Sequence, residues 1–248
     1  MITEHELKIF SRQLILNEFN EKNFKFLQQQ HVIIIGVGGI GCPVAQYLVS
    51  TGIKHLTLID NGIIQLSNLN RQILFNEKDL GEKKVDIAKE KLRFINSKNN
   101  INTISKKISK KNISQHLSNS SLVVDTTDNW ESMTLVNNYC VKNSIPLLSA
   151  SVIGYDGQVI LFKNIKNHHL CLNCIYPNQN EPNLPRCDTV GVLGTAAGLT
   201  GLIATQLIIN FFTKIHENVE KLIMINSKLM KIDYIKIKEN DNCPSKKN

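Results

Sequence analysis

The strongest constraint on the fold is a regular alternation of short apolar runs with helix-like segments in the N-terminal part of the chain. Runs that resemble buried strands stand at residues 31–36, 55–60, 101–108, 121–127 and 146–151. Between them, apolar residues recur at helical spacing, most clearly at 39–52 and 83–96. Strands that alternate with helices in this way predict an α/β fold with a doubly wound, mostly parallel sheet.

After residue 151 the pattern changes to that of antiparallel strands. Residues 152–163 predict a hairpin whose turn falls near Asp156 and Gly157. Residues 221–227 and 231–238 predict further antiparallel strands. The sheet is therefore expected to continue beyond its parallel part.

The N-terminal segment predicts a helical arm. Thr3 and Glu6 form a capping-box pattern in front of an amphipathic helix that carries Leu7, Phe10, Leu14 and Ile15. The sequence contains neither an internal repeat nor a separate linker. We therefore expect one domain over residues 1–248, with the arm at 1–30, a first half at 31–151 and a cysteine-rich second half at 152–248.

Composition narrows the functional classes. The first ten residues have neither the basic start nor the apolar run of a signal peptide, and six cysteines in such a chain predict reduced thiols in the cytoplasm. The formal charge of +8 raises the question of nucleic acid, but the densest basic run, residues 105–111, has no aromatic side chain for stacking bases. We expect no nucleic-acid partner, and an acidic protein would suit the same surface.

Residues 191–213 carry no charge and are long enough to cross a bilayer, which needs about 20 apolar residues. The segment nevertheless contains polar side chains, among them those of Thr195, Thr200, Thr205, Gln206 and Asn210. It therefore predicts a helix in the core or at a subunit interface, and we expect no membrane association.

A glycine-rich turn lies between the first strand and the first helix of the α/β pattern. Its sequence GVGGIG places glycines at Gly36, Gly38, Gly39 and Gly41. Glycines in this context let the backbone approach a phosphate, which the helix N-terminus also favours. Asp60 closes the second strand, where a carboxylate accepts hydrogen bonds from ribose hydroxyls. By themselves these residues fit a nicotinamide-dependent dehydrogenase equally well.

The residues that follow Asp60 favour a nucleoside triphosphate. The segment LSNLNRQ supplies Asn68, Arg71 and Gln72, and Lys84 begins the next helix. A dehydrogenase needs no arginine and lysine here, whereas Arg binds phosphate oxygens as a fork and Lys as a point charge. Asp128, at the end of the fourth strand, is a candidate ligand for Mg²⁺ on the phosphates.

The ordered set of motifs SRQ, GVGGIG, LSNLNRQ, GEKKVDIAKEKL, DTTDN, GQV, CLNC and CDTVGVLG resembles the ThiF/MoeB/HesA family, bacterial relatives of ubiquitin-activating enzymes. The resemblance covers nearly the whole chain and implies a Rossmann-like sheet. It also implies an ATP and Mg²⁺ site made of Asp60, Asn68, Arg71, Gln72, Lys84 and Asp128. Arg12 matches an arginine that reaches the ATP of the other subunit, which implies a homodimer.

The resemblance further implies the reaction. Such enzymes transfer AMP from ATP to the C-terminal glycine carboxylate of a small ubiquitin-like sulfur carrier ending in Gly-Gly, and residues 152–248 would form the carrier-binding half. SASVIGYDGQ and NQNEP favour a ThiS-like carrier (thiamine thiazole) over a MoaD-like one (molybdopterin). A cysteine desulfurase or another sulfur donor is a candidate second partner.

Three alternatives stay open. A nicotinamide oxidoreductase rests on the glycine turn and Asp60 alone, and other superfamily members modify a transfer RNA at the same ATP site. A non-catalytic carrier-binding scaffold is suggested by Lys246, which stands in place of a family cysteine, and by two further departures from the family pattern. Gly62 stands where a second acidic residue is common, and Ile9 where an arginine is common. Neither departure removes a phosphate ligand, so we expect weakened contacts rather than a lost reaction.

The cysteines supply a candidate zinc site. Cys171 and Cys174 have the spacing of half a structural site. In the family a second pair near the C-terminus completes four cysteines, but here Cys243 is followed by Lys246 at the fourth place, with His168 and His169 as conceivable substitutes. Zinc binding therefore stays open.

The remaining cysteines divide into one reactive candidate and two core residues. Cys187 lies beside Arg186 ahead of the uncharged helix, where the thiolate is favoured. In the thiamine branch of the family, a cysteine at this place can join covalently to the activated carrier during sulfur transfer. In other branches it is not strictly needed, and a buried structural thiol is the alternative. Cys42 and Cys140 fall within helices and are expected in the core.

Overall fold

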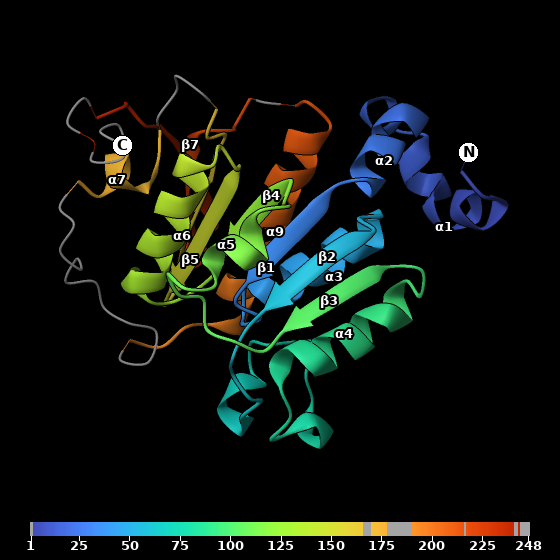
Figure 1. Cartoon of the computed structure of the whole chain (residues 1–248), viewed down its shortest axis with the longest axis horizontal. Helices are drawn as coiled ribbons and strands as arrows, with labels where there is room; N and C mark the ends of the chain where they lie inside the picture. The colour runs from blue at the N-terminus through green and yellow to red at the C-terminus, as the bar shows by residue number, and fades with distance from the viewer. Residues whose placement is uncertain (1, 166–169, 178–189, 216, 241–242, 244–248) are drawn as a thin grey trace.

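The computed structural model describes residues 2–165, 170–177, 190–215, 217–240 and 243 (Figure 1). Its strands are β1 (His31–Ile35), β2 (His55–Ile59), β3 (Asn100–Ile104), β4 (Leu122–Asp125), β5 (Leu147–Ile153), β6 (Asp156–Phe162), β7 (Lys221–Asn226) and β8 (Lys231–Lys236). Its α-helices are α1 (Glu4–Leu14), α2 (Glu21–Gln28), α3 (Gly41–Thr51), α4 (Lys84–Ile95), α5 (Ile113–Leu117), α6 (Trp130–Lys142), α7 (Leu172–Ile175) and α9 (Gly194–Phe212). Short 3₁₀ turns lie at Asn17–Phe19, Leu66–Asn68 and Glu77–Asp79.

All eight strands form one sheet in the order β3-β2-β1-β4-β5-β6-β7-β8. The strands from β3 to β5 are parallel, and the pairs β5–β6, β6–β7 and β7–β8 are antiparallel. The predicted mixed α/β sheet is confirmed, including the weak strand within residues 101–108. The order of the strands reverses between β1 and β4, which is where open α/β sheets bind ligands.

Helices cover both faces of the sheet (Figure 1). Alternate residues of β1 face opposite cores: Ile34 packs with α3, α4 and α9, and Ile33 packs with α5 and α6. Because both faces of β1 are buried, its apolar run is continuous rather than alternating. The carboxyl ends of these strands are thereby held rigidly for the site.

The uncharged segment forms α9, which packs against α3, β5 and β6. Among the described residues, α9 is the one helix whose length and composition would suit a membrane span, and half of its most apolar window is buried inside the fold. Gly201 permits the contact with α3, since a Cβ there would lie 2.5 Å from the Pro43 side chain. The predicted core helix is confirmed for the face of α9 that packs against α3, β5 and β6.

The predicted hairpin is present, but its turn was placed wrongly. β5 ends at Ile153 and β6 begins at Asp156, with those two residues paired, so the turn is Gly154–Tyr155. Gly154 has a φ of 59°, as a tight turn requires. Gly157 instead lies inside β6, where a Cβ would fall 2.1 Å from Thr200 Oγ1 of α9. That glycine is needed for helix packing rather than for the turn.

Candidate ATP-binding active site

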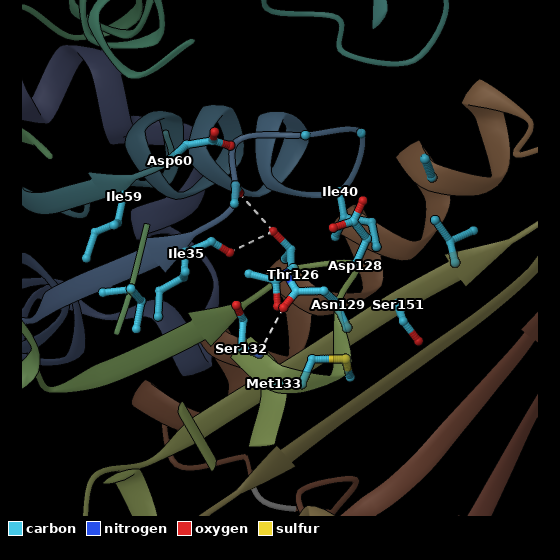
Figure 2. A pocket seen from close by; sticks show the side chains of 18 of the residues that line it. Ile35, Ile40, Ile59, Asp60, Thr126, Asp128, Asn129, Ser132, Met133 and Ser151 are labelled. Atoms are coloured by element: carbon cyan, nitrogen blue, oxygen red, sulfur yellow. Dashed lines mark hydrogen bonds between the residues drawn. The ribbon is translucent and has the colours of Figure 1, made fainter. Parts of the chain in front are cut away.

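A cavity of about 380 Å³ opens at the carboxyl ends of β1, β2 and β4 (Figure 2). Eight of the residues singled out in the sequence line it: Gly36, Gly38, Gly39, Asp60, Arg71, Gln72, Lys84 and Asp128. These residues come from five separate segments of the chain, and the reversal of strand order brings them to one place. The cavity therefore joins the glycine turn, the ribose-binding carboxylate and the two cations.

The glycine turn is fixed by contacts that exclude larger side chains. Gly36 has a φ of 92°, and Thr126 Oγ1 donates to its carbonyl oxygen at 2.8 Å and to that of Ile35 at 3.1 Å (Figure 2). Gly41 does not line the cavity, and a Cβ there would lie 2.0 Å from the Gly36 carbonyl oxygen. Gly41 thus lets α3 start directly behind the turn, with its first N–H groups directed toward the ligand site.

Asp60 is held by the backbone. Its two carboxylate oxygens accept from the N–H groups of Val37 and Gly62, each at 2.7 Å. A Cβ at Gly62 would lie 3.0 Å from Asp60 Oδ1 and 3.3 Å from Lys84 Nζ. The departure from the family pattern at Gly62 therefore gives Lys84 room beside Asp60 and leaves the carboxylate free to accept from ribose hydroxyls.

Arg71 and Gln72 lie next to the glycine turn. A Cβ at Gly39 would be 3.4 Å from Arg71 Cγ, and a Cβ at Gly38 would be 3.9 Å from Gln72 Nε2. One guanidinium nitrogen of Arg71 donates to the Ser67 carbonyl at 2.8 Å and to Asn70 Oδ1 at 3.0 Å, which orients the remaining donors. Gln72 is only 4% exposed, and its Oε1 has no hydrogen-bond partner among the described residues. A buried, unpaired polar atom on a cavity wall is costly unless a ligand or water satisfies it. The remaining donors of Arg71 suit phosphate oxygens, and Gln72 Oε1 can accept a hydrogen bond from a ligand or water.

Asp128 projects from the turn after β4 and is exposed in the cavity. Asp125 supports this turn, since its Oδ1 accepts from Thr127 N at 3.0 Å and from Thr127 Oγ1 at 2.7 Å. Burial raises the pKa of Asp125 to about 6, although the Thr127 bonds oppose the shift. The buried carboxyl group shapes the turn, and Asp128 stays available to a cation.

Besides Gly41, two predicted site residues that the structure describes, Asn68 and Arg12, do not line the cavity. Asn68 is buried under the loop, where its Oδ1 accepts from Gln65 N at 3.2 Å and its carbonyl accepts from the N–H groups of Arg71 and Gln72. Asn68 therefore shapes the loop that carries the phosphate ligands. Arg12 is exposed on α1 and does not line the cavity of its own chain. Cys187 lies outside the described residues.

The sequence did not reveal several residues of the cavity wall: Lys106, Lys107, Trp130, Ser151, Gln158 and Tyr176. Lys107 Nζ forms an exposed ion pair with Glu131 Oε2 at 3.3 Å across the cavity mouth. The two lysines belong to the basic run at residues 105–111, to which the sequence analysis assigned no role in the site. Trp130 carried a signal, since the single tryptophan of the chain directly follows DTTDN.

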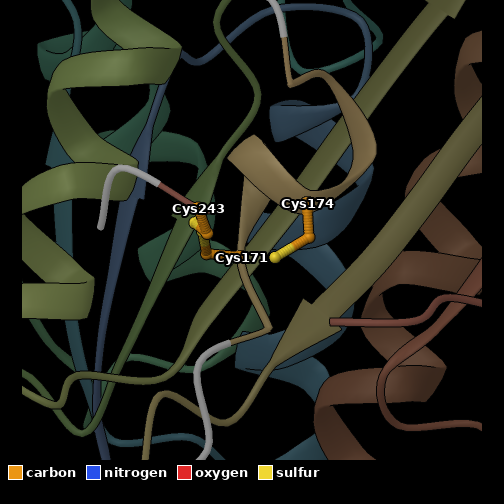
Figure 3. A group of neighbouring side chains, drawn as sticks. All are labelled: Cys171, Cys174 and Cys243. Atoms are coloured by element: carbon orange, nitrogen blue, oxygen red, sulfur yellow. The ribbon is translucent and has the colours of Figure 1, made fainter. Parts of the chain in front are cut away.

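A thiol cluster lies at α7, where Cys171 is the N-cap, Cys174 lies within the helix, and Cys243 approaches from the end of the described chain (Figure 3). Their sulfur atoms all lie within 4.8 Å of one another, with 3.5 Å between those of Cys171 and Cys243. Hydrogen bonding from Cys171 lowers the pKa of Cys174 to about 5, against the effect of burial. Three thiols at this spacing fit zinc, while Lys246, His168 and His169 lie outside the described residues.

The other two described cysteines are core residues, as predicted. Cys42 and Cys140 are fully buried free thiols. Burial raises the pKa of Cys42 to about 12 and also raises that of Cys140. Neither is suited to act as a nucleophile at neutral pH.

Comparisons with known proteins find similar adenylyltransferases and activating enzymes. The sulfur carrier protein ThiS adenylyltransferase of Escherichia coli is 27% identical over 98% of this chain and 96% of its own length. The SAMP-activating enzyme E1 of Haloferax volcanii is 27% identical over 96% and 88%. Adenylyltransferase and sulfurtransferase MOCS3-1 of Drosophila pseudoobscura is 37% identical over 84% of this chain, which spans just under half of that protein.

Solved structures show the same fold. MccB of E. coli with MccA-N7isoAsn matches with a TM-score of 0.83 and 22% identity, over 98% of this chain and 75% of that one. MccB with ATP matches with a TM-score of 0.79 and 22% identity, over 100% and 83%. The sequence pattern of the ThiF family matches residues 10–245. The chain belongs to the ThiF family.

Proposed function

We propose that this protein uses ATP and Mg²⁺ to adenylate the C-terminal glycine carboxylate of a small ubiquitin-like sulfur-carrier protein. The observation that carries the proposal is the meeting of Asp60, Arg71 and Lys84 with the glycine turn in one cavity. Ribose and phosphate groups are thereby addressed together. Membership of the ThiF family and the named activities of its relatives support the same reaction.

The reaction needs positioning and charge neutralisation rather than an acid or base. A carrier carboxylate oxygen attacks the α-phosphorus of ATP, the bond to the β-phosphate oxygen breaks, and pyrophosphate leaves. The attacking carboxylate is already ionised, so no proton has to move. Arg71 and Lys84 stabilise the charge that grows on the leaving phosphates, and Asp128 would hold Mg²⁺, which would neutralise further phosphate charge.

A ThiS-like carrier is favoured over a MoaD-like one. The E. coli ThiS adenylyltransferase matches this chain over nearly the full length of both proteins, and SASVIGYDGQ and NQNEP agree with that branch. The MoaD-like alternative stays open because MOCS3 relatives share the adenylation part at higher identity. In the thiamine reading, Cys187 would join covalently to the activated carrier in the cytoplasm, with a sulfur donor as second partner.

A homodimer completes the proposed site. Phe10 and Glu6 attach α1 near the amino ends of the parallel strands, whereas the cavity lies at their carboxyl ends. Phe10 packs by Gly52 at the end of α3, and Glu6 pairs with Lys54 ahead of β2. α3 starts at the cavity and is 11 residues long, which is about 16 Å. Because Arg12 lies on this arm and does not line its own cavity, we propose that it acts at the ATP site of a second subunit.

The remaining alternatives are less well supported. A nicotinamide oxidoreductase gives no role to Arg71 and Lys84 on the cavity wall. A non-catalytic scaffold was suggested by Gly62 and Ile9, but Gly62 supplies an N–H group to Asp60 and space to Lys84. The donor set of the cavity is thus intact.

Carrier-dependent exchange of labelled pyrophosphate into ATP tests the proposal. ThiS-like and MoaD-like proteins ending in Gly-Gly are supplied separately, and exchange with one of them is the expected result. No exchange with either, in protein that binds ATP by calorimetry, would exclude both carriers as substrates.

Two neighbouring lysines provide a matched pair for the same assay. Lys84→Ala should lower exchange at least about tenfold, because a charge that stabilises the transition state is removed. Lys83→Ala should leave it near the wild-type rate, since Lys83 is exposed and does not line the cavity. Equal rates in the two variants would remove Lys84 from the proposed mechanism.

A further inference from the structure

One end of the cavity carries a set of side chains that the adenylation chemistry leaves without a role. Trp130 is the first residue of α6, Gln158 lies on β6, and Tyr176 directly follows α7. All three line the cavity. They are brought together from three distant segments, so the wall is built by tertiary packing rather than by one loop.

The three side chains are locked to one another. Tyr176 OH donates to Gln158 Oε1 at 2.8 Å. The Tyr176 ring meets Trp130 edge-on, with 5.5 Å between ring centroids and 89° between ring planes. Such contacts leave the wall little freedom to rearrange.

This set stands apart from the charged end of the cavity. Gln158 is paired with Ser151 across β5 and β6, and Ser151 also lines the cavity. Figure 2 shows Ser151 on the far side of Asp128 from Asp60. A nucleotide whose ribose is at Asp60 would place its base beside Ile59 and Ile35, which lie on the Asp60 side (Figure 2). The aromatic end is therefore left for the second substrate.

The hydrogen bond from Tyr176 decides what Gln158 offers to that substrate. Because its Oε1 accepts from the phenol, the Nε2 group is the part of the amide that remains to donate, and no described residue accepts from it. An amide donor on a cavity wall matches the carbonyl oxygen of an extended peptide. The flanking rings narrow the space, which suits residues without a Cβ.

We propose that Trp130, Gln158 and Tyr176 form the subsite for the last residues of the carrier tail, with Gln158 donating to a tail carbonyl and Tyr176 acting as its positioning residue. This inference rests on the proposed adenylation of a carrier ending in Gly-Gly. Tyr176 is itself fixed by α7, since its N–H donates to the Leu172 carbonyl at 2.9 Å. Cys171 is the N-cap of α7 and Cys174 lies within it, so the thiol cluster and Tyr176 are joined by one short helix.

The test separates the KM for carrier from the KM for ATP. Tyr176→Phe keeps the ring but removes the donor, and Gln158→Leu removes the amide. Each should raise the KM for carrier about five- to tenfold, the size of one lost hydrogen bond, and leave the KM for ATP unchanged. Tyr155→Phe is the matched control, because Tyr155 is exposed at the β5–β6 turn and is expected to keep both wild-type values.

A double variant tests whether Tyr176 acts through Gln158. In the Gln158→Leu background, Tyr176→Phe should have no further effect on the KM for carrier, because the group it positions is already gone. Fully additive effects would overturn the positioning role. An unchanged KM for carrier in both single variants, or a matching rise in the KM for ATP, would overturn the subsite.

The wild-type protein distinguishes failure of the inference from failure of the proposed function. If wild type shows no exchange with any carrier, the adenylation proposal itself fails. If wild type is active and a carrier whose penultimate glycine is replaced by alanine is used as well as the natural one, the narrow aromatic subsite fails alone. The expected result is activity with the natural tail and at least about a tenfold loss with the alanine tail.

Discussion

Two glycines illustrate how single residues set the geometry of the site. Gly41 allows α3 to start against the Gly36 carbonyl, 2.0 Å from where its Cβ would be, whereas a Cβ at Gly198 in α9 would meet nothing within 4 Å. The first glycine is required by packing, and the second only lowers helix propensity. The two positions therefore predict opposite responses to the same substitution.

Gly41→Ala should destabilise the protein by about 3 kcal/mol or more, because a rigid backbone carbonyl has to move. Gly198→Ala should stabilise it by about 0.5–1 kcal/mol. Thermal unfolding checks both, since about 1 kcal/mol shifts the midpoint by roughly 2–4 °C at this length. An unchanged midpoint for Gly41→Ala would contradict the close approach of α3 to the glycine turn.

At the residue scale, the sequence predicted the parts of the site that directly follow the first two strands or begin the helix after them. Gly36, Asp60, Arg71 and Lys84 meet as expected. Tyr176 was not foreseen, because its position depends on how the segment around α7 packs against the sheet, and that segment lies far along the chain from Asp128 and Trp130. No local pattern encodes such a crossing.

At the scale of helices, the arm is attached through one buried carboxylate. Glu6 accepts from Lys54 Nζ at 2.7 Å, from Gln28 Nε2 at 2.8 Å, and from the backbone N–H and hydroxyl of Thr3, both at 2.9 Å. The predicted capping box is thus confirmed and extended by two distant partners. The bonds to Lys54 and Thr3 lower the pKa of Glu6 from 4.5 to about 2.

Glu6→Gln should destabilise the protein by about 1–3 kcal/mol at neutral pH, the cost of losing a bond to a charged group. The pKa of Glu6 is lower in the folded state than in the unfolded state. Its contribution is therefore complete above pH 4.5 and is lost as the pH falls toward 2. Denaturant unfolding at a series of pH values should show the gap between wild type and variant shrinking over that window.

Glu4→Gln is the control for this helix. Glu4 pairs with Lys8 on the surface, with 82% of its side chain exposed, and such pairs contribute little. A gap for Glu6→Gln that stays constant as the pH falls through the same window would contradict the assigned pKa.

The helix α7 has only four residues, and the thiol cluster of Cys171, Cys174 and Cys243 lies at it. Cys243, from the end of the described chain, is buried against Cys171, so a metal would join two segments that are distant in sequence. Purified protein is expected to contain close to one zinc per chain, and Cys243→Ser should lose it and unfold at a lower temperature. Metal analysis beside Cys140→Ser, a buried cysteine outside the cluster, separates ligand loss from general damage.

Retention of zinc by Cys243→Ser, or a metal-free wild type after mild purification, would make the cluster a set of packed thiols. The sequence indicated only Cys171 and Cys174 as a pair with Cys243 as a distant partner. Whether three cysteines suffice depends on chain folding at residues 243–248, which spacing does not encode.

At the scale of the molecule, the alternation of strands and helices predicted the sheet, because a parallel sheet requires a crossover between successive strands. The predicted antiparallel strand at residues 231–238 is confirmed as β8, but the turn at Gly154 could not be fixed in the same way, since Gly157 is required by packing against α9 instead. The arm was predicted as a helix, but its position at the edge away from the cavity follows only from tertiary contacts of Glu6 and Phe10. That position gives Arg12 a role only if chains associate.

Exposed apolar side chains surround Arg12 on the arm. Leu7 is 48%, Ile15 75% and Leu16 56% exposed, although the capping box and Phe10 hold the helix firmly. An ordered helix with apolar residues left in solvent is typical of an interface, and a second copy of the chain is the partner that our proposal requires.

Arg12→Ala and Asp128→Ala chains should each be inactive alone, because each dimer then has two incomplete sites. When the two chains are mixed, each heterodimer has one site with both Arg12 and Asp128, provided that the arm acts on the other subunit. Pyrophosphate exchange should then recover to a measurable fraction of wild type, at most half of it in a pure heterodimer. If Arg12 served its own chain, both sites of the heterodimer would lack one group, and heterodimers verified by differential tagging would stay inactive.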